Sequence, residues 1–213
     1  MSTTFLEALA GTKLYPLTDR VISGLSHAEQ IVQLSEAGAN LVQLREKVLP
    51  SLEFYNEAAR ALSVARERRV KIIINDRVDI ALALGADGVH LGQQDLPPAA
   101  ARRVLGAEAI IGISTHNLEQ ALLAADMPVD YITIGPIFAT ATKQSINHPL
   151  GIQGLVRLRE ASGELPVVAI GGITAKNGES VLQAGADAIA IISDLWTSAG
   201  PLSARVENFI HRP

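Results

Sequence analysis

The fold of this chain is decided by Ile72-Ile-Ile-Asn-Asp-Arg-Val-Asp-Ile-Ala-Leu-Ala-Leu-Gly-Ala-Asp-Gly-Val-His-Leu-Gly-Gln-Gln-Asp95. The apolar run 72–74 is typical of a strand that is buried on both faces. Residues 78–84 are rich in Ala and Leu, and the Gly85 that follows them predicts a short helix with a glycine stop. Residues 88–91 form the next predicted strand. The stretch therefore predicts two parallel strands joined by a crossover helix.

Two carboxylates follow these two strands. Asn75 and Asp76 come directly after the first strand, and Asp95 closes the loop after the second. Because neighbouring parallel strands end at the same edge of a sheet, we expect Asp76 and Asp95 to lie close together. Carboxylate oxygens suit Mg²⁺, which takes one or two protein carboxylates and completes its shell with water and substrate phosphate. The alternative is that both are ordinary loop carboxylates, one of them capping a helix.

The same alternation of strand and helix continues along the chain. Further strands are predicted at 13–19, 41–45, 109–113, 130–134, 167–170 and 188–192. Ser26 and Glu29 form a capping box that opens one helix, and another is predicted at 174–184. A third helix is expected to bury a face formed by Leu52, Tyr55, Ala59 and Leu62.

Eight strands alternating with eight helices predict a single (β/α)₈ TIM-barrel domain over residues 1–213, with 1–12 as an N-terminal extension. The turn Gly-Ala-Asn or Gly-Ala-Asp recurs at 38–40, 85–87 and 185–187, which favours one cyclic architecture over two domains. A flavodoxin-like open sheet is the alternative, and it leaves three predicted strands unaccounted for.

Composition limits the classes of function. The 213 residues carry a net charge of −4 and only 4% aromatic residues, so a nucleic acid is not expected as a partner. The chain has no cysteine, which excludes disulfides and thiolate metal sites. No apolar run approaches the roughly 20 residues of a membrane helix, and the N-terminus lacks the pattern of a signal peptide. We therefore expect a cytoplasmic protein without a membrane partner.

Polar residues at the other strand ends are the candidates for chemistry, because barrel active sites lie there. Gln43, Arg45 and Lys47 share one face after the second strand, by the period of two. Two cations beside two carboxylates indicate a site for pyrophosphate and a metal. Ion pairing of Arg45 and Lys47 with Glu46 at the surface is the alternative.

Later strand ends offer hydroxyls, a cation and glycines. Ser114 follows the fifth strand, where it either donates to a substrate or satisfies the loop. Thr140, Thr142 and Lys143 lie on a long loop after the sixth strand that suits an anion-binding lid. Gly172 and Ser193 follow strands seven and eight, where barrels frequently bind phosphate. The neighbouring Asp194 would repel a phosphate, so its side chain must point away.

Histidines are less informative. His90 lies late in the fourth strand, where it either touches a ring-shaped substrate or is a satisfied core residue. His27, His148 and His211 are expected in solvent-exposed surroundings without a function.

Seven motifs in this order resemble the thiamine phosphate synthase family. The motifs are Gln43-x-Arg45-x-Lys47, Asn75-Asp76-Arg77, His90-Leu91-Gly92-Gln93-x-Asp95, Gly112-x-Ser114-Thr115-His116, Thr140-x-Thr142-Lys143, Gly171-Gly172-Ile173 and Ile192-Ser193. The resemblance spans about 14–196. It implies a TIM barrel that joins 4-amino-5-hydroxymethyl-2-methylpyrimidine diphosphate to a thiazole phosphate, with Mg²⁺ as cofactor and pyrophosphate as the second product.

The resemblance also implies roles for single residues. Asp76 and Asp95 would bind Mg²⁺. The pyrimidine diphosphate would be held by Gln43, Arg45, Lys47, Asn75, Ser114 and Lys143, of which Arg45, Lys47, Ser114 and Lys143 are the predicted catalytic residues. The thiazole phosphate would be held by Thr140, Thr142, Gly172, Ile192 and Ser193. The family often has Pro where Ala139 stands and Ala where Asp194 stands.

A set of groups that stabilises a departing anion favours a dissociative reaction. Three other functions stay open: a related thiazole tautomerase, a non-catalytic sensor of thiamine precursors, and an isomerase of sugar phosphates. The small-molecule substrates are the expected partners, and the sequence leaves a homo-oligomer open.

Overall fold

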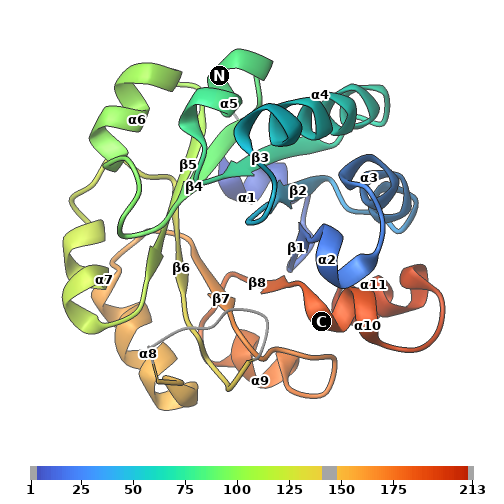
Figure 1. The fold of residues 1–213 in the computed structure, drawn as a ribbon. Coiled ribbons are helices and arrows are strands. Elements are labelled where there is room, and N and C mark those ends of the chain that lie inside the picture. Colours follow the sequence, from blue (N-terminus) through green and yellow to red (C-terminus); the bar gives the residue numbers. More distant parts are fainter. Residues whose placement is uncertain (1–3, 141–147, 211–213) are drawn as a thin grey trace.

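Figure 1 shows a computed structural model that describes residues 4–140 and 148–210. Its strands form a closed barrel in which each strand is parallel to its neighbours in sequence order, and β8 pairs with β1. The strands are β1 (Leu14–Thr18), β2 (Leu41–Leu44), β3 (Lys71–Asn75), β4 (Gly88–Leu91), β5 (Ile110–Thr115), β6 (Tyr131–Ile134), β7 (Val167–Ile170) and β8 (Ala188–Ile191). The predicted TIM barrel is confirmed, and closure by β8 excludes the open sheet.

Helices surround the strands (Figure 1). They are α1 (Phe5–Ala8), α2 (Arg20–Ser23), α3 (His27–Glu36), α4 (Ser51–Glu67), α5 (Val78–Leu84), α6 (Pro98–Leu105), α7 (Leu118–Ala124), α8 (Gly151–Ala161), α9 (Gly178–Gln183), α10 (Ser193–Thr197) and α11 (Leu202–Ile210). The capping box of Ser26 and Glu29 opens α3 as predicted. None of the helices in the described ranges is long and apolar enough to cross a membrane.

One predicted helix boundary is wrong. The sequence indicated a helix from 174, but α9 begins at Gly178. The side chain of Asn177 accepts a hydrogen bond of 2.8 Å from the backbone N–H of Thr174. This local bond holds residues 174–177 in a turn, because an Asn side chain competes with the helical hydrogen bonds of its own backbone.

The strands are buried on both faces, which explains their continuous apolar sequences. Leu41 and Ile73 belong to a cluster inside the barrel, whereas their neighbours Val42 and Ile72 pack in the larger cluster between strands and helices. Gln43 is the polar member of the inward-facing row on β2 and is only 2% exposed. Side chains alternate along a strand, so a substitution on either row meets a filled core.

The buried face of α4 differs from the prediction. Leu52 and Tyr55, which were expected to be buried, are 71% and 38% exposed. Phe54, Ala58 and Ala61 are buried instead, and Leu62 is buried as predicted. The small alanines let the helix backbone lie close to the strands, so the packing row follows the alanines and Phe54 rather than the first leucine of the helix.

The N-terminal segment packs its apolar side chains into the interior of the barrel. Helix α1 lies behind the strands in the view of Figure 1, and a capping box between Thr4 and Glu7 begins it. Phe5 is 1% exposed and Leu9 is 2% exposed, and both belong to the cluster inside the barrel. The ring of Phe5 stacks on that of Tyr131 with centroids 3.9 Å apart. Within residues 1–12, the described part is therefore integral to the core rather than an appended extension.

Replacing Phe5 by Ala is expected to lower the free energy of unfolding by ~3–5 kcal/mol, the usual cost of emptying a buried aromatic site. Leu6 is the matched control, because it belongs to the same short helix but is 43% exposed. Leu6→Ala should cost about 1 kcal/mol or less. Urea unfolding followed by circular dichroism measures both variants. Equal losses of stability would show that Phe5 does not fill the barrel as described.

Candidate active site

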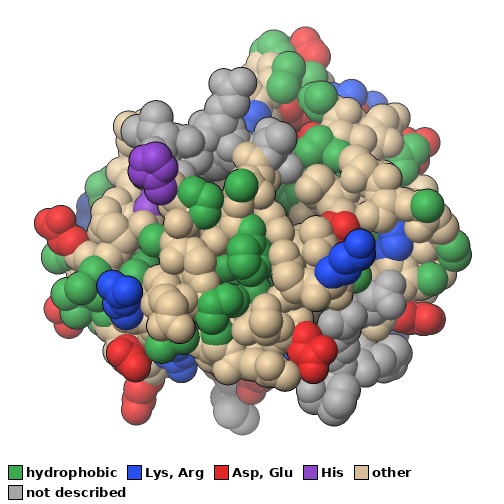
Figure 2. Space-filling view, turned by 90° about the horizontal axis from the view of Figure 1, so that it is seen from below, with side chains coloured by type: hydrophobic (Ala, Val, Ile, Leu, Met, Phe, Trp, Pro, Cys, Tyr) green, Lys and Arg blue, Asp and Glu red, His purple; other side chains and the backbone are tan. Residues whose placement is uncertain are grey.

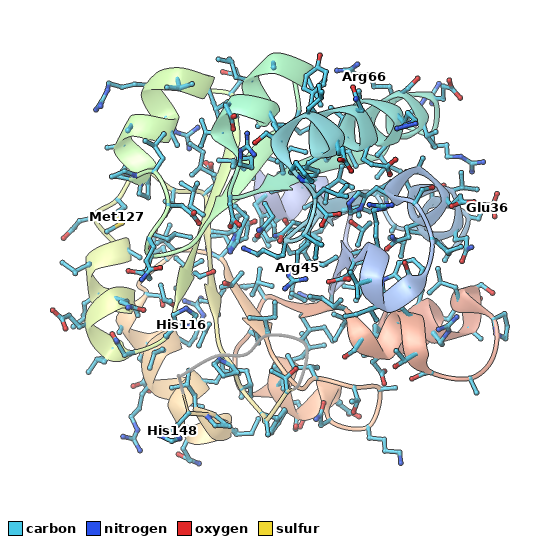
Figure 3. The ribbon with its side chains drawn as sticks, viewed as in Figure 1. Glu36, Arg45, Arg66, His116, Met127 and His148 are labelled. Carbon is cyan, nitrogen blue, oxygen red and sulfur yellow. The ribbon has the colours of Figure 1, made fainter. Side chains whose placement is uncertain are left out.

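A cavity of about 590 Å³ opens where the strands end. Eleven of the thirteen predicted site residues line it: Gln43, Arg45, Lys47, Asn75, Asp76, Asp95, Ser114, Thr140, Gly172, Ile192 and Ser193. Thr142 and Lys143 lie outside the described residues. Figure 3 shows Arg45 and His116 toward the middle of the barrel, whereas Glu36, Arg66 and Met127 lie at its periphery. The structure thus gathers the predicted residues in one place, and their roles stay predictions.

The two predicted metal ligands lie side by side. Burial raises the pKa of the Asp76 carboxyl, the ammonium of Lys47 opposes this rise, and the adjacent Asp95 carboxylate adds to it. Lys47 Nζ contacts Asp76 Oδ2 directly. The backbone of Asp76 is left-handed, with φ 64°, which is uncommon for a residue with a side chain and marks a constrained position. The strand end therefore crowds two like charges beside the ammonium of Lys47.

This pair fits a magnesium ion. Within the described residues, no group of three His, Asp or Glu side chains could hold a metal ion. Two carboxylates match what Mg²⁺ takes from a protein when substrate phosphate and water complete its octahedron. Burial is the main cause of the raised pKa of Asp76, and a divalent cation would relieve the repulsion from Asp95 that adds to it. Asp76 and Asp95 are therefore the residues that would hold Mg²⁺.

Arg45 is held by a neighbour on another strand end. Its Nη1 contacts Oδ2 of Asp19. Oδ1 of Asp19 in turn accepts a hydrogen bond of 3.0 Å from the backbone N–H of Ile22 in α2. The Arg45 side chain is only 14% exposed. This pair differs from the surface pairing with Glu46 that the sequence left open. Arg45 is therefore oriented toward the cavity before any substrate arrives.

Glu46 organises the loop that carries Lys47. Its Oε1 accepts hydrogen bonds from the backbone N–H groups of Lys47, Val48 and Leu49, at 2.9, 2.8 and 3.2 Å. Its Oε2 lies 3.5 Å from Nε2 of His27. The expectation that His27 is solvent-exposed is wrong, because its exposure is 0%. The periodic pattern of α3 gave no signal for this contact, since the partner comes from the β2–α4 loop.

Acidification is expected to weaken the fold through His27. Burial lowers the pKa of His27 more than the nearby Glu46 raises it. The unfolded chain then binds a proton at a higher pH than the folded one, so stability is full above the usual histidine pKa and falls as pH drops below it. The loss is at most ~1.4 kcal/mol per pH unit for one proton.

Urea unfolding between pH 7 and pH 5 measures this loss. His27→Gln should flatten the dependence, whereas His148→Gln, which changes an exposed histidine, should leave it as in the wild-type chain. Three parallel curves would exclude His27 as the group responsible.

Asn75 offers an unpaired donor to the cavity. Its side chain is 7% exposed, and Nδ2 has no hydrogen-bond partner among the described residues. A buried amide without a partner costs ~1–3 kcal/mol, so such a group is commonly a ligand contact. Asn75 lines the cavity, and a substrate acceptor there would satisfy it.

His90 lies inside the barrel beside Ser114. Its Nε2 is 2.9 Å from Ser114 Oγ, and its Nδ1 is 3.0 Å from the hydroxyl of Tyr131. Tyr131 and Tyr15 were not identified from the sequence. Each sits in an apolar strand segment, and its polar partners come from strands far away in the chain, so no local pattern marks it.

The opposite rim is made by β7 and β8. Gly171 and Gly172 have φ values of +100° and +64°, and a Cβ on Gly172 would lie 2.5 Å from the carbonyl oxygen of Ala139. Only glycine therefore fits this close approach of two loops. Asp194 points away as predicted: it accepts from Ala175 N at 3.2 Å and from Ser198 Oγ at 3.0 Å. The Gly172 and Ser193 rim thus keeps its capacity for an anion.

Comparisons with known proteins agree with this geometry. The family model described as thiamine monophosphate synthase matches residues 14–195. The chain is 46% identical to a thiamine-phosphate synthase of Clostridium novyi, over 85% of this chain and 89% of that one. It is 45% identical to one of Chloroflexus aurantiacus, over 85% and 83%. The solved thiamine phosphate pyrophosphorylase from Pyrococcus furiosus superposes with a TM-score of 0.82 and 36% identity, over 93% and 94%.

Proposed function

The chain belongs to the thiamine monophosphate synthase family, and we propose that its cavity joins a pyrimidine diphosphate to a thiazole phosphate. It is an enzyme of thiamine biosynthesis, a transferase with thiamine-phosphate synthase activity. The proposed substrates are 4-amino-5-hydroxymethyl-2-methylpyrimidine diphosphate and 4-methyl-5-(2-phosphoethyl)thiazole or its carboxylated form. Thiamine phosphate and pyrophosphate would be the products, and the carboxylated form would in addition release its carboxyl group as carbon dioxide.

The observation that supports these substrates is that two sets of predicted anion-binding residues lie on opposite rims of the cavity. Asp76, Asp95 and Lys47 lie at the ends of β2 to β4, and Gly172 and Ser193 lie at the ends of β7 and β8. In a closed barrel of this order, β3 stands across from β7. A diphosphate on one rim and a phosphate on the other would place the reacting carbon and nitrogen over the centre.

The chain's own groups would bind and orient the diphosphate. Asp19 fixes Arg45, and Asp76 contacts Lys47, so both cations are held in position to stabilise charge that develops on the departing pyrophosphate. Mg²⁺, when bound by Asp76 and Asp95, would supply further neutralisation of that charge. The amide of Asn75 would donate to the same substrate. Lys143 is proposed to act on the diphosphate, and Thr142 on the thiazole phosphate.

The reaction is proposed to be dissociative. The carbon–oxygen bond of the pyrimidine methylene breaks, pyrophosphate leaves with the electron pair, and the thiazole nitrogen then attacks the resulting cation. That nitrogen carries a lone pair, so the chain does not have to remove a proton before the attack. The amino group of the pyrimidine would donate electron density to the developing cation.

Incubation with both substrates, with and without Mg²⁺, tests the proposal. Thiamine phosphate and pyrophosphate should form in equal amounts, and only when both substrates and Mg²⁺ are present. Binding of both substrates in calorimetry without product would instead identify a sensor and overturn the proposed activity.

The partners are proposed to be these small molecules. Figure 2 shows acidic and basic side chains interspersed on one face of the described chain. Such a face differs from the single-sign basic patch of a nucleic-acid site. A homo-oligomer stays a prediction.

A further inference from the structure

A line of hydrogen bonds crosses the interior of the barrel beneath the cavity. Gln43 Nε2 donates to the Tyr15 hydroxyl at 3.1 Å, and that hydroxyl is 3.0 Å from the hydroxyl of Tyr131. Tyr131 is 3.0 Å from His90 Nδ1, and His90 Nε2 is 2.9 Å from Ser114 Oγ. The line links β2, β1, β6, β4 and β5 in turn. Both of its ends, Gln43 and Ser114, line the cavity.

The members in the middle of the line have almost no exposure to water, although Tyr15 and His90 border the floor of the cavity. Tyr15 and Tyr131 are 0% exposed, and His90 is 5% exposed. Phe5 packs against both tyrosine rings, stacked on Tyr131 and edge-on to Tyr15 with centroids 5.4 Å apart. Burial also raises the pKa of each tyrosine hydroxyl, which therefore stays protonated and able to donate. The packing of Phe5 therefore fixes the positions of both tyrosine rings. Only the direction of each hydroxyl hydrogen can still vary.

The sequence of donors and acceptors along the line determines the direction of each hydroxyl hydrogen. Because Gln43 donates to Tyr15, the hydroxyl hydrogen of Tyr15 has the Tyr131 oxygen as its acceptor among the described residues. Tyr131 then donates to His90 Nδ1, which must be the bare nitrogen of a neutral ring. The hydrogen of His90 is consequently on Nε2, where Ser114 Oγ at 2.9 Å is a nearer acceptor than Thr133 Oγ1 at 3.5 Å, and Thr133 itself donates to Ser114 Oγ at 3.4 Å. The hydroxyl hydrogen of Ser114 is then available to an acceptor in the cavity.

We propose that Tyr15, Tyr131 and His90 are positioning residues that orient Ser114 as a donor and the Gln43 carbonyl as an acceptor toward the pyrimidine ring. This inference rests on the proposed function, which assigns Gln43 and Ser114 to the pyrimidine diphosphate. A 4-aminopyrimidine carries ring nitrogens that accept and an amino group that donates, so a site with one fixed donor and one fixed acceptor matches it. This line of hydrogen bonds from Gln43 to Ser114, called the relay below, acts on the pyrimidine substrate. The residues of the thiazole phosphate rim are not part of it.

Removing single hydroxyls tests the relay. Tyr131→Phe and Tyr15→Phe keep the rings that pack on Phe5 but break the line. Each should lower kcat/KM for the pyrimidine diphosphate by about tenfold, as for a buried partner left unsatisfied, while the KM for thiazole phosphate stays within about twofold. The chain's third tyrosine gives a matched control: Tyr55 is 38% exposed on α4, and Tyr55→Phe should leave all parameters within about twofold. Unchanged kinetics in both relay variants would overturn the proposal.

Two further measurements separate positioning from mere packing. His90→Gln retains a side-chain donor for Ser114 and should keep more kcat/KM than His90→Leu, which retains none. Equal losses in the two variants would count against the relay. Nitrogen-15 spectra of the unliganded wild-type protein, with the His90 signals identified by their loss in His90→Gln, should show the tautomer protonated at Nε2.

The nitrogen spectra make the relay testable even where a variant fails to fold, because they use the wild-type chain. A His90 ring protonated at Nδ1 would reverse the line and overturn the proposal. The spectra also separate the relay from the proposed function. A chain that showed the Nε2 tautomer but formed no thiamine phosphate would contradict the substrates while leaving the relay in place.

Discussion

Asp76→Asn and Asp95→Asn are each expected to lower turnover at limiting Mg²⁺ by at least about a hundredfold, which corresponds to ~2.7 kcal/mol of barrier. A carboxamide keeps the size of the side chain but replaces a charged oxygen with a neutral one, a poor ligand for a hard cation. Asn at 95 can still accept from the N–H of Gly92, as Asp95 does at 2.7 Å, so the turn should persist. The effect therefore reports on charge rather than on folding.

Asp79 provides the control for these variants. It lies three residues after Asp76, its side chain is 65% exposed, and it pairs with Arg77 at 2.5 Å rather than facing the cavity. Asp79→Asn should leave turnover within about twofold. Calorimetric titration of Mg²⁺ in the presence of pyrophosphate gives a second readout that does not depend on catalysis. Tight Mg²⁺ binding in both Asp76→Asn and Asp95→Asn would remove the pair from the metal site.

Asp76→Asn should also remove the ion pair of Lys47 and thereby change the affinity for the diphosphate. The ammonium of Lys47 contacts the Asp76 carboxylate, and no carboxylate remains at that position in the variant. A loss of diphosphate affinity larger in Asp76→Asn than in Asp95→Asn would therefore locate Lys47 on the diphosphate. This comparison uses two variants of equal chemistry, so the difference isolates the cation.

The strand–helix–strand unit at the centre of the chain was predictable because its signals are local. Helix α5 and strand β4 have the bounds that the sequence indicated, and Gly85 ends the helix with φ 60°. The continuous apolar strands also indicated burial on both faces. Each signal involves residues within a few positions of one another, which is the range over which periodicity and glycine stops carry information.

Contacts between distant segments were not predictable in the same way. Phe5 packs on Tyr131, and Tyr15 bonds Tyr131, across more than a hundred residues. Likewise, the sequence left open a surface pair of Arg45 with Glu46, but Glu46 is turned toward His27 and its own loop. The carboxylate pair was predictable because barrel topology itself brings neighbouring strand ends together. The partners of single side chains depend on the packed interior, which a sequence pattern does not encode.

The electronic demand of the pyrimidine ring should control the rate of the chemical step. The rim around Asp76 carries Arg45 and Lys47. Their cationic groups stabilise a departing anion, which suits early cleavage of the carbon–oxygen bond. A cation would then develop on the ring. Exchanging the ring methyl for trifluoromethyl withdraws electrons strongly with a modest change in size. The rate should fall by far more than tenfold, where each factor of ten is ~1.4 kcal/mol of barrier.

The comparison requires single-turnover conditions with enzyme in excess, because product release would otherwise mask the chemical step. The affinity of the trifluoromethyl compound, measured separately, controls for its bulk: unchanged binding with a slowed reaction locates the effect in the transition state. A rate within about a factor of two of the natural substrate, under ~0.5 kcal/mol on the same scale, would rule out substantial cation character. Direct displacement by the thiazole nitrogen would then be favoured, because attack on a carbon with little positive charge responds weakly to the ring substituent.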